Sequence, residues 1–131
     1  MTQPRWLDHR IIVALHDVQL ARHGGAGGIR DAGLLESALG RPLNRHGYGE
    51  TDLHVLAAAY AFGIVRNRPF VDGNKRTGFV AAALFLEENG LSLMAPEPEA
   101  VVMTLGLASG EMPEAGFAAW LRDRTEPVGR T

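Results

Sequence analysis

Cysteine is absent from the 131 residues, and lysine occurs once, as Lys75. The lack of cysteine excludes a disulfide scaffold, a thiolate zinc site, an iron–sulfur protein and a cysteine nucleophile. The apolar run 79–86 is far shorter than the ~20 residues of a membrane span, and the first ten residues contain no signal-peptide core. These absences predict a soluble, cytoplasmic protein without a membrane partner.

Excess charge of one sign is also missing, because 13 basic and 15 acidic residues give a net charge of −2. A chain with this balance has no global field that attracts nucleic acid or an anionic membrane. Direct nucleic-acid binding is therefore not expected. Twelve of the 13 basic residues are arginine, which draws attention to the position of the single lysine.

Strand-like alternation is almost absent, and apolar residues instead recur with the period of a helix. The pattern predicts an all-α fold of about six helices, in one domain over residues 1–124 with a flexible tail over 125–131. Helices are expected over 7–23, 31–39, from Thr51 or Asp52 to Arg68, and over 74–89, 99–109 and 113–124. Gly40-Arg41-Pro42 is expected to stop the second helix and to open a loop that ends at Glu50.

Polar, charged and glycine residues concentrate between the two most apolar helices, in the segment 67–77. Gly73 allows a tight turn, and the first N–H groups of the following helix lack intrahelical acceptors. The helix dipole, Lys75 and Arg76 add positive charge, which suits a phosphate group. Asp72 stands just before this cradle, where a carboxylate can hold a magnesium ion that bridges phosphate oxygens.

Chemistry alone leaves a second interpretation open, in which Asp72 or Asn74 is only a helix cap and the two cations are solvated. Cations in the first turn of a helix are unfavourable to its dipole, however. The presence of two cations in this first turn therefore favours the interpretation in which the segment binds an anion.

The sequence Phe70-Val71-Asp72-Gly73-Asn74-Lys75-Arg76-Thr77 closely resembles the core motif of the death-on-curing toxins, the Doc branch of the Fic/Doc superfamily. The resemblance covers roughly residues 7 to 124. It extends upstream through His16-Asp17, His23-Gly24-Gly25 and the segment 28–39, and downstream through 86–90 and 117–121.

The resemblance implies an all-α fold and a phosphotransferase that uses ATP and Mg²⁺. It also implies a cognate Phd-like antitoxin that docks a helix in a groove, and elongation factor Tu as the protein substrate. By similarity, Asp72 would be the metal-linked carboxylate. Gly73, Asn74 and Thr77 would contribute to phosphate binding, and Lys75 and Arg76 would neutralise charge on the transferred group.

Three positions depart from related patterns. Fic enzymes that transfer AMP carry Gly in place of Lys75 and a second Arg in place of Phe79, so phosphate transfer is favoured over AMP transfer. The family motif also has a catalytic His where this chain has Arg68. A guanidinium cannot act as a general base, because its pKa stays above ~12, so this copy is expected to be catalytically impaired.

Two alternatives remain open: a Fic-type AMP transferase, and a non-catalytic module that binds nucleotide or antitoxin. Other residues carry weaker predictions. Phe70 is expected to pack in the core, and His9, His16 and His23 to lie on a polar helix face, with His16 the candidate to face the site. His46 and His54 are expected at the surface or as caps, and the loop 41–50 as a connector or a substrate-docking flap. Trp6 and Met94 are weak candidates for the antitoxin groove.

Overall fold

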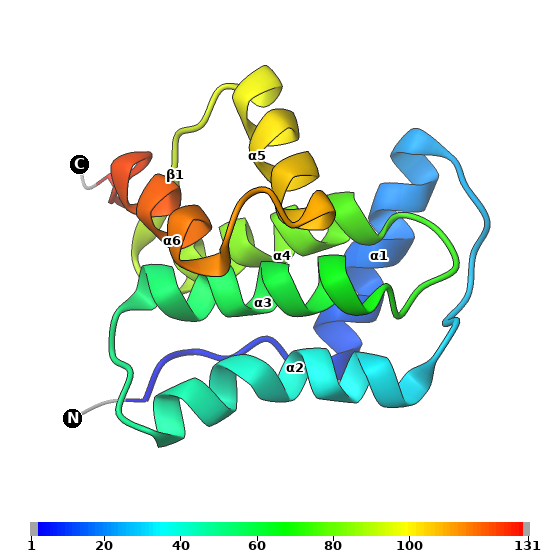
Figure 1. The fold of residues 1–131 in the computed structure, drawn as a ribbon, viewed down its shortest axis with the longest axis horizontal. Coiled ribbons are helices and arrows are strands. Elements are labelled where there is room, and N and C mark those ends of the chain that lie inside the picture. Colours follow the sequence, from blue (N-terminus) through cyan, green and yellow to red (C-terminus); the bar gives the residue numbers. More distant parts are fainter. Residues whose placement is uncertain (1–2, 130–131) are drawn as a thin grey trace.

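The structure of the protein is a computed structural model, and it describes residues 3–129. Six helices and two short strands follow one another along this part of the chain (Figure 1). Their bounds are α1 His9–His23, α2 Ala32–Gly47, α3 Leu53–Asn67, α4 Asn74–Glu88, β1 Leu91–Leu93, α5 Glu97–Ser109, α6 Glu114–Asp123 and β2 Thr125–Pro127. The all-α prediction is confirmed.

Helix α3 forms the centre of the molecule, because its residues are apolar on nearly every side. It packs against α2, α4, α5 and α6, while α1 packs against α4. The approach of α3 to α4 is close: a Cβ atom added to Gly78 would lie 2.6 Å from Cγ2 of Val65. The core that results is rich in small and aromatic side chains, among them Tyr60, Phe70, Phe85 and Phe117.

Several helix ends agree with the sequence prediction. The side chains of Asp31 and Asp52 accept hydrogen bonds from the N–H groups of Leu34 and His54, which caps α2 and α3. Helix α1 ends before Gly24, and α3 ends at Asn67, just before the Arg68-Pro69 pair. The local signals of capping residues, glycine and proline therefore place these boundaries correctly.

The predicted stop at Gly40-Arg41-Pro42 is wrong, because α2 continues through Pro42 to Gly47. An interior proline removes one helical hydrogen bond, so packing must compensate for the loss. Pro42 itself is buried. Arg41 and Arg45, one turn apart, both pair with Glu114 of α6, which holds the second half of the helix. The predicted loop 41–50 is thus mostly helix.

The predicted flexible tail is also wrong for its first residues. Strand β2 pairs antiparallel with β1, with Leu91 opposite Pro127 and Leu93 opposite Thr125. The Val128 N–H donates to the Gly90 carbonyl, and His54 Nε2 lies 2.8 Å from Thr125 Oγ1. These contacts from distant segments fix the chain after α6. Residues 130 and 131 of the predicted tail lie outside the described residues.

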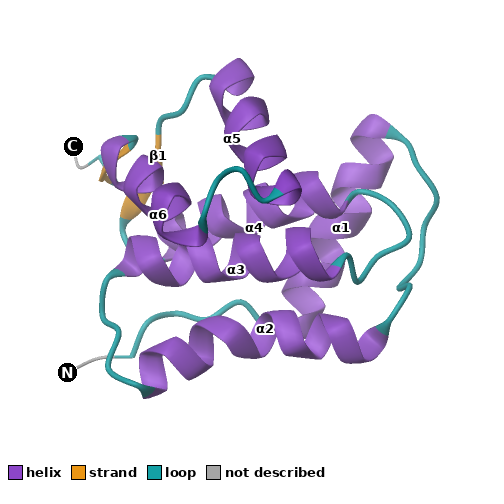
Figure 2. Cartoon of the chain, in the orientation of Figure 1, coloured by secondary structure: helices purple, strands orange, loops and turns teal. Residues whose placement is uncertain are grey.

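Two loops meet at the right-hand edge of the molecule, where the α1–α2 and α3–α4 connections lie side by side (Figure 2). The Val71 N–H donates to the Gly28 carbonyl, and Ile29 forms an isolated β-bridge with Phe70. The segment with the candidate chemistry is therefore supported from a neighbouring loop. Within residues 3–129, no helix is long and apolar enough to cross a membrane.

Candidate functional site

Helix α4 begins on a left-handed glycine and carries no acidic residue in its first turn. Gly73 is the N-cap with φ 80° and ψ 14°, a conformation that glycine adopts without strain. No side chain caps this helix, and the Thr77 N–H is the first to bond back, to the Gly73 carbonyl. The N–H groups of Asn74, Lys75 and Arg76 consequently keep no backbone acceptor within the described chain.

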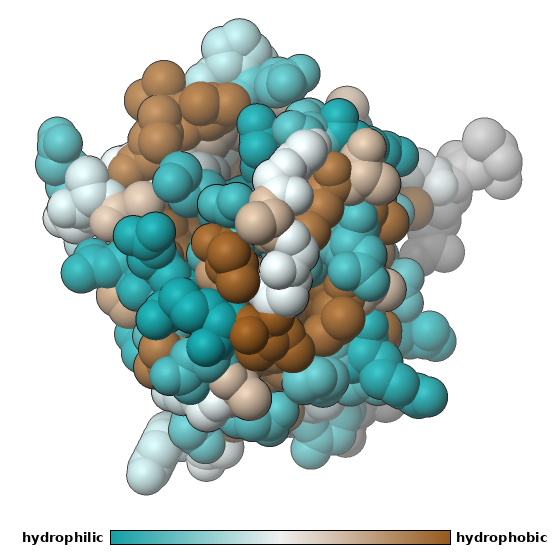
Figure 3. All heavy atoms as spheres, turned by 90° about the vertical axis from the view of Figure 1, so that its right-hand side faces the viewer, coloured by the Kyte–Doolittle hydropathy of each residue, from teal (hydrophilic) through white to brown (hydrophobic). Residues whose placement is uncertain are grey.

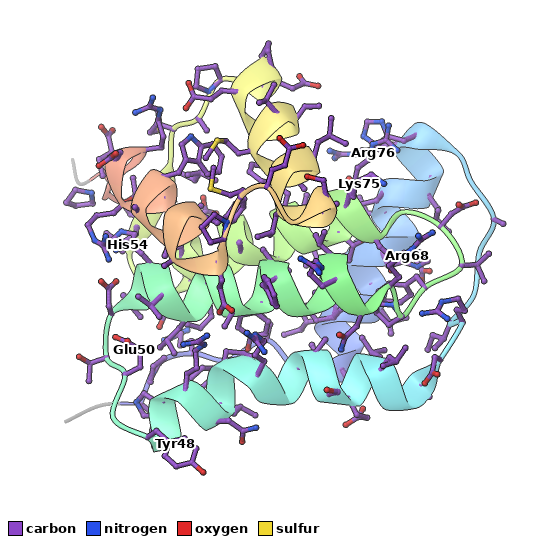
Figure 4. The ribbon with its side chains drawn as sticks, viewed as in Figure 1. Tyr48, Glu50, His54, Arg68, Lys75 and Arg76 are labelled. Atoms are coloured by element: carbon purple, nitrogen blue, oxygen red, sulfur yellow. The ribbon has the colours of Figure 1, made fainter. Side chains whose placement is uncertain are left out.

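Lys75 and Arg76 add two full charges to this helix end. Both side chains are exposed, and neither forms an ion pair with any residue in the range 3–129. Figure 4 shows them together at the start of α4, beside α5. Dipole, free N–H groups and cations therefore act in the same place, which is an arrangement that favours a bound anion.

A cavity of about 570 Å³ opens at this helix end. Its floor includes Asp72 and residues 73–76, and Gln19 and His23 of α1 form one wall. The other wall comes from α5 and the second turn of α4 and is largely apolar: Phe79, Val80, Glu97, Ala100, Val101, Thr104 and Leu105. The cavity combines a cationic end with an apolar side, as sites for small organic ligands commonly do.

Asp72, in the lining of the cavity, is held by two different segments. Its Oδ2 accepts the Ala26 N–H at 2.9 Å, and its backbone carbonyl lies 2.7 Å from Nε2 of His16. Oδ1 has no hydrogen-bond partner among the described residues. A carboxylate oxygen is a suitable ligand for Mg²⁺, which proteins usually hold with one or two carboxylates together with the phosphates of the substrate.

No group of three or more His, Asp or Glu side chains comes together as a metal cage among residues 3–129. The donor set around Asp72 therefore fits a magnesium ion that arrives with a nucleotide better than a resident metal ion.

Asn74 has a different place from the one predicted for a phosphate-binding side chain. Its Oδ1 accepts the Phe70 N–H and its Nδ2 donates to the Phe70 carbonyl, both at 2.9 Å. The side chain is buried and both ends of its amide are used. It closes the loop onto the helix start, so a phosphate-binding role remains a prediction for the backbone N–H alone. Thr77 is fully buried, and its Oγ1 finds no partner within the described chain.

Arg68 occupies a left-handed position at the end of α3, with φ 51° and ψ 56°. Among the described residues it is the one non-glycine residue with a positive φ, a conformation that costs about 1–2 kcal/mol. Its side chain is exposed and is not part of the cavity lining. In Figure 4 it lies across the connecting loop from Lys75 and Arg76.

His16 corrects the prediction of three histidines on a polar face. It is 2% exposed, and its ring stacks on Phe70 with centroids 3.8 Å apart. Because a carbonyl oxygen only accepts, Nε2 must carry the proton that it donates to Asp72. His16 was the candidate to face the site; it supports the loop from beneath and is not among the residues that line the cavity. Phe70 is buried, which confirms its predicted packing role.

Of the other histidines among the described residues, only His23 lines the cavity. His9 and His23 are exposed, as predicted. His54 bonds to the cap residue Asp52, and His46 packs edge-on against Trp6.

Four contributors to the site are not predicted by the sequence: Arg30, Gln19, His23 and the α5 wall. Arg30 donates from Nε to the Arg68 carbonyl at 2.7 Å and from Nη2 to the Asn67 carbonyl at 2.8 Å. The α5 wall cannot be found from local sequence patterns, because α5 begins 20 positions after the motif ends at Thr77. The family resemblance includes the segment 28–31, which contains Arg30, but no local sequence pattern indicates that this segment contacts residues 67 and 68.

The sequence of this chain is similar to those of known proteins. The sequence model described as Fic/DOC family matches residues 6–86. A protein of Escherichia phage P1 named "Protein kinase doc" is 39% identical over 112 residues, which are 85% of this chain and 88% of that protein. A Mycolicibacterium smegmatis protein named "Toxin Doc" is 44% identical over 75 residues, which are 55% of this chain and 57% of that protein. The chain belongs to the Fic/Doc superfamily, in its Doc toxin branch.

Proposed function

We propose that this chain is the toxin of a toxin–antitoxin pair and, by lineage, an ATP-dependent protein kinase that acts in the cytoplasm. Elongation factor Tu is the proposed substrate, phosphorylated on a hydroxyl so that translation stops and growth arrests. The proposal is supported by the kinase name of the phage relative and by the chemistry at the start of α4. That helix end presents three N–H groups and two cations, which have no ion-pair partner within residues 3–129, to a cavity of nucleotide size.

Phosphoryl transfer requires positioning and charge neutralisation more than covalent chemistry from the protein. In the proposed reaction the terminal phosphoryl group of ATP passes to the substrate hydroxyl, ADP leaves, and the hydroxyl proton must pass to a base. Lys75, Arg76 and the N–H groups of α4 would hold the phosphates. Asp72 would bind Mg²⁺, which supplies charge neutralisation at the phosphates when it is bound.

The base is the missing element, because Arg68 stands where the family motif has its His. A guanidinium keeps its proton at any ordinary pH, whereas a neutral imidazole can take one. Loss of a general base typically slows a reaction by about 10²–10⁴-fold. We therefore propose that this copy binds nucleotide but transfers phosphate slowly.

The Arg68→His variant tests this function. Histidine is among the residues that tolerate a left-handed backbone, so the turn should be preserved. The purified variant is incubated with elongation factor Tu and ATP labelled at either the γ- or the α-phosphate, and growth is followed on induction in cells. Arg68→Gln is the matched control, because it removes the guanidinium without supplying a base.

We expect growth arrest and transfer of the γ-label with Arg68→His and neither with Arg68→Gln. Transfer of the α-label would instead establish an AMP transferase. The absence of Arg at Phe79 argues against that alternative, since no second guanidinium is then available on this face of α4 to hold a γ-phosphate. Nucleotide binding without arrest or transfer would overturn the kinase proposal and indicate a binding module.

The partner antitoxin is proposed to dock a helix on α5. Val101, Val102 and Leu105 are 52%, 66% and 49% exposed, and two of them also line the cavity. Figure 3 shows hydrophobic side chains gathered at the upper edge of this face, over α5. A helix laid on this surface would bury apolar area and reach the phosphate end of the cavity.

Leu105→Asp should weaken antitoxin binding at least tenfold in a titration of the purified pair. Leu43→Asp on α2 is the matched control, because Leu43 is similarly exposed, at 47%, and lies away from the cavity. Equal loss in both variants would place the antitoxin elsewhere.

A further inference from the structure

Arg30 joins the end of α3 to the neighbouring loop through three hydrogen bonds. Its Nε and Nη2 donate to the carbonyls of Arg68 and Asn67 at 2.7 and 2.8 Å, and its own N–H donates to the Pro69 carbonyl at 2.6 Å. The last carbonyls of a helix have no intrahelical partner. Arg30 satisfies two of them from a segment 37 and 38 residues away in sequence.

The α3–α4 loop, residues 68–73, is held in two halves by different residues. Its second half is fixed by Asn74, which clasps the backbone of Phe70, and by His16, which donates to Asp72. Its first half contains the left-handed residue Arg68. Within residues 3–129, no side chain other than Arg30 donates to the carbonyls of Asn67 or Arg68.

The planar guanidinium suits this task, since it presents donors in a fixed fork that can bridge two adjacent carbonyls. Rotation of the peptide after residue 68 would break the Nε bond. The direction of the side chain at position 68 is set by that same backbone conformation. Arg30 therefore restrains where any side chain at this position can point.

We propose that Arg30 is a positioning residue for position 68, the place at which the family carries its general base. The proposal rests on the proposed function for its catalytic consequence. Arg30 sets the orientation of the base through the left-handed turn, while the phosphate cradle on α4 is held independently by Asn74 and His16. Loss of Arg30 should thus impair the proton-transfer step and leave nucleotide binding intact.

The first arm of the test uses Arg30→Ala and Arg30→Lys in the Arg68→His protein. A displaced catalytic group lowers turnover by about 10–100-fold, so kcat should fall by that factor with Arg30→Ala. The KM for ATP should stay within about twofold, since ground-state binding is unchanged. Arg30→Lys should recover only part of kcat, because one ammonium cannot reproduce the fork. Arg10→Ala, which removes an exposed arginine of α1, is the matched control and should leave kcat unchanged.

The second arm needs no activity and uses amide hydrogen exchange on the chain with Arg68 in place. Arg30→Ala should raise the exchange rates of the Val71 and Arg68 N–H groups about tenfold or more, and leave Ala58 in the centre of α3 unchanged. Faster exchange at Ala58 as well would mean general destabilisation and would overturn the positioning role.

Unchanged exchange at the loop, or unchanged kcat beside a loosened loop, would also overturn the proposal. An inactive Arg68→His protein would refute the proposed kinase and not the positioning role of Arg30, because the exchange arm still decides whether Arg30 fixes the turn.

Discussion

Two groups of cations in this small protein have opposite surroundings. Arg41 and Arg45 of α2 both pair with Glu114, whose side chain is only 12% exposed, and Arg41 also lies over the ring of Phe62. Lys75 and Arg76 have no acidic partner among the described residues. The first pair of cations contributes to packing within the protein, whereas the second pair is free to bind an external anion.

The helix starts show the same contrast. Helices α5 and α6 carry Glu97, Glu99 and Glu114 in their first turns, where the dipole favours negative charge. Helix α4 carries only cations there. Helix α1 also has a cation, Arg10, in its first turn, but the Asp8 carboxylate caps that helix, whereas no side chain caps α4. The exception indicates that α4 awaits an anion from outside the chain.

The strongest test of this contrast removes the unpaired group. The double variant Lys75→Ala, Arg76→Ala should bind ATP at least ~100-fold more weakly, because two charge-assisted contacts are lost. Its thermal stability should be unchanged or slightly higher, since each removed cation relieves about 0.3–1 kcal/mol of dipole repulsion. Calorimetric titration and thermal unfolding measure the two effects. A loss of stability would contradict the assignment of these residues to ligand binding.

Removal of a paired cation should have the reverse result. Arg41→Ala leaves the nearly buried Glu114 with one partner fewer and takes the guanidinium from Phe62, so we expect about 2 kcal/mol less stability. ATP affinity should be unchanged. Denaturant unfolding monitored by circular dichroism measures the free energy of unfolding. Reduced ATP affinity in a variant that remains folded would contradict the assignment of Arg41 to packing.

A second ion-paired site, around Asp52, makes stability depend on pH. Burial raises the pKa of Asp52, but hydrogen bonds from Arg122 and His54 outweigh this effect, so the pKa lies below its usual value. A carboxyl group with a depressed pKa stabilises the fold above its unfolded pKa, and this contribution disappears as the pH falls through the folded value.

Asp52→Asn should therefore lower stability by up to about 1 kcal/mol at pH 7, while Asn still caps α3. The difference from the parent should shrink as the pH falls below the unfolded pKa of aspartate and vanish once the pH is below the lowered folded pKa, as measured by unfolding across pH. A difference that persists in acid would assign the effect to packing instead of charge.

The smallest expected effect concerns the left-handed turn. Arg68→Asn should stabilise the protein by up to about 1 kcal/mol, because asparagine adopts this conformation more readily than arginine. The midpoint of thermal unfolding measures the change. Destabilisation would indicate that the arginine side chain makes a contribution beyond its backbone.

The sequence predicted the start of α4 well because every feature of it is local. Gly73, Lys75 and Arg76 lie within four residues, and capping rules apply at that distance. Helix α2 was predicted poorly for the opposite reason: its continuation past Pro42 depends on Glu114, which is 72 residues away. The same holds for strand β2, which forms only because β1 is present to pair with it.

The support of the site was beyond local rules for the same reason. His16 has the helical spacing of an exposed residue, yet it is buried because Phe70 stacks on it. The motif also suggested that the Asn74 side chain holds phosphate, whereas its amide closes the loop onto the backbone of Phe70. Sequence reasoning located the charged residues, but the residues that hold them in place required the fold.

The most direct test of the account is a calorimetric titration of the unaltered protein, with Arg68 in place, with ATP and Mg²⁺. We expect ATP to bind saturably at one site. This binding should be lost in the Lys75→Ala, Arg76→Ala variant and kept in Arg41→Ala. Absence of binding to the unaltered protein, or equal binding by both variants, would contradict the claim that the start of α4 holds the phosphates of a nucleotide.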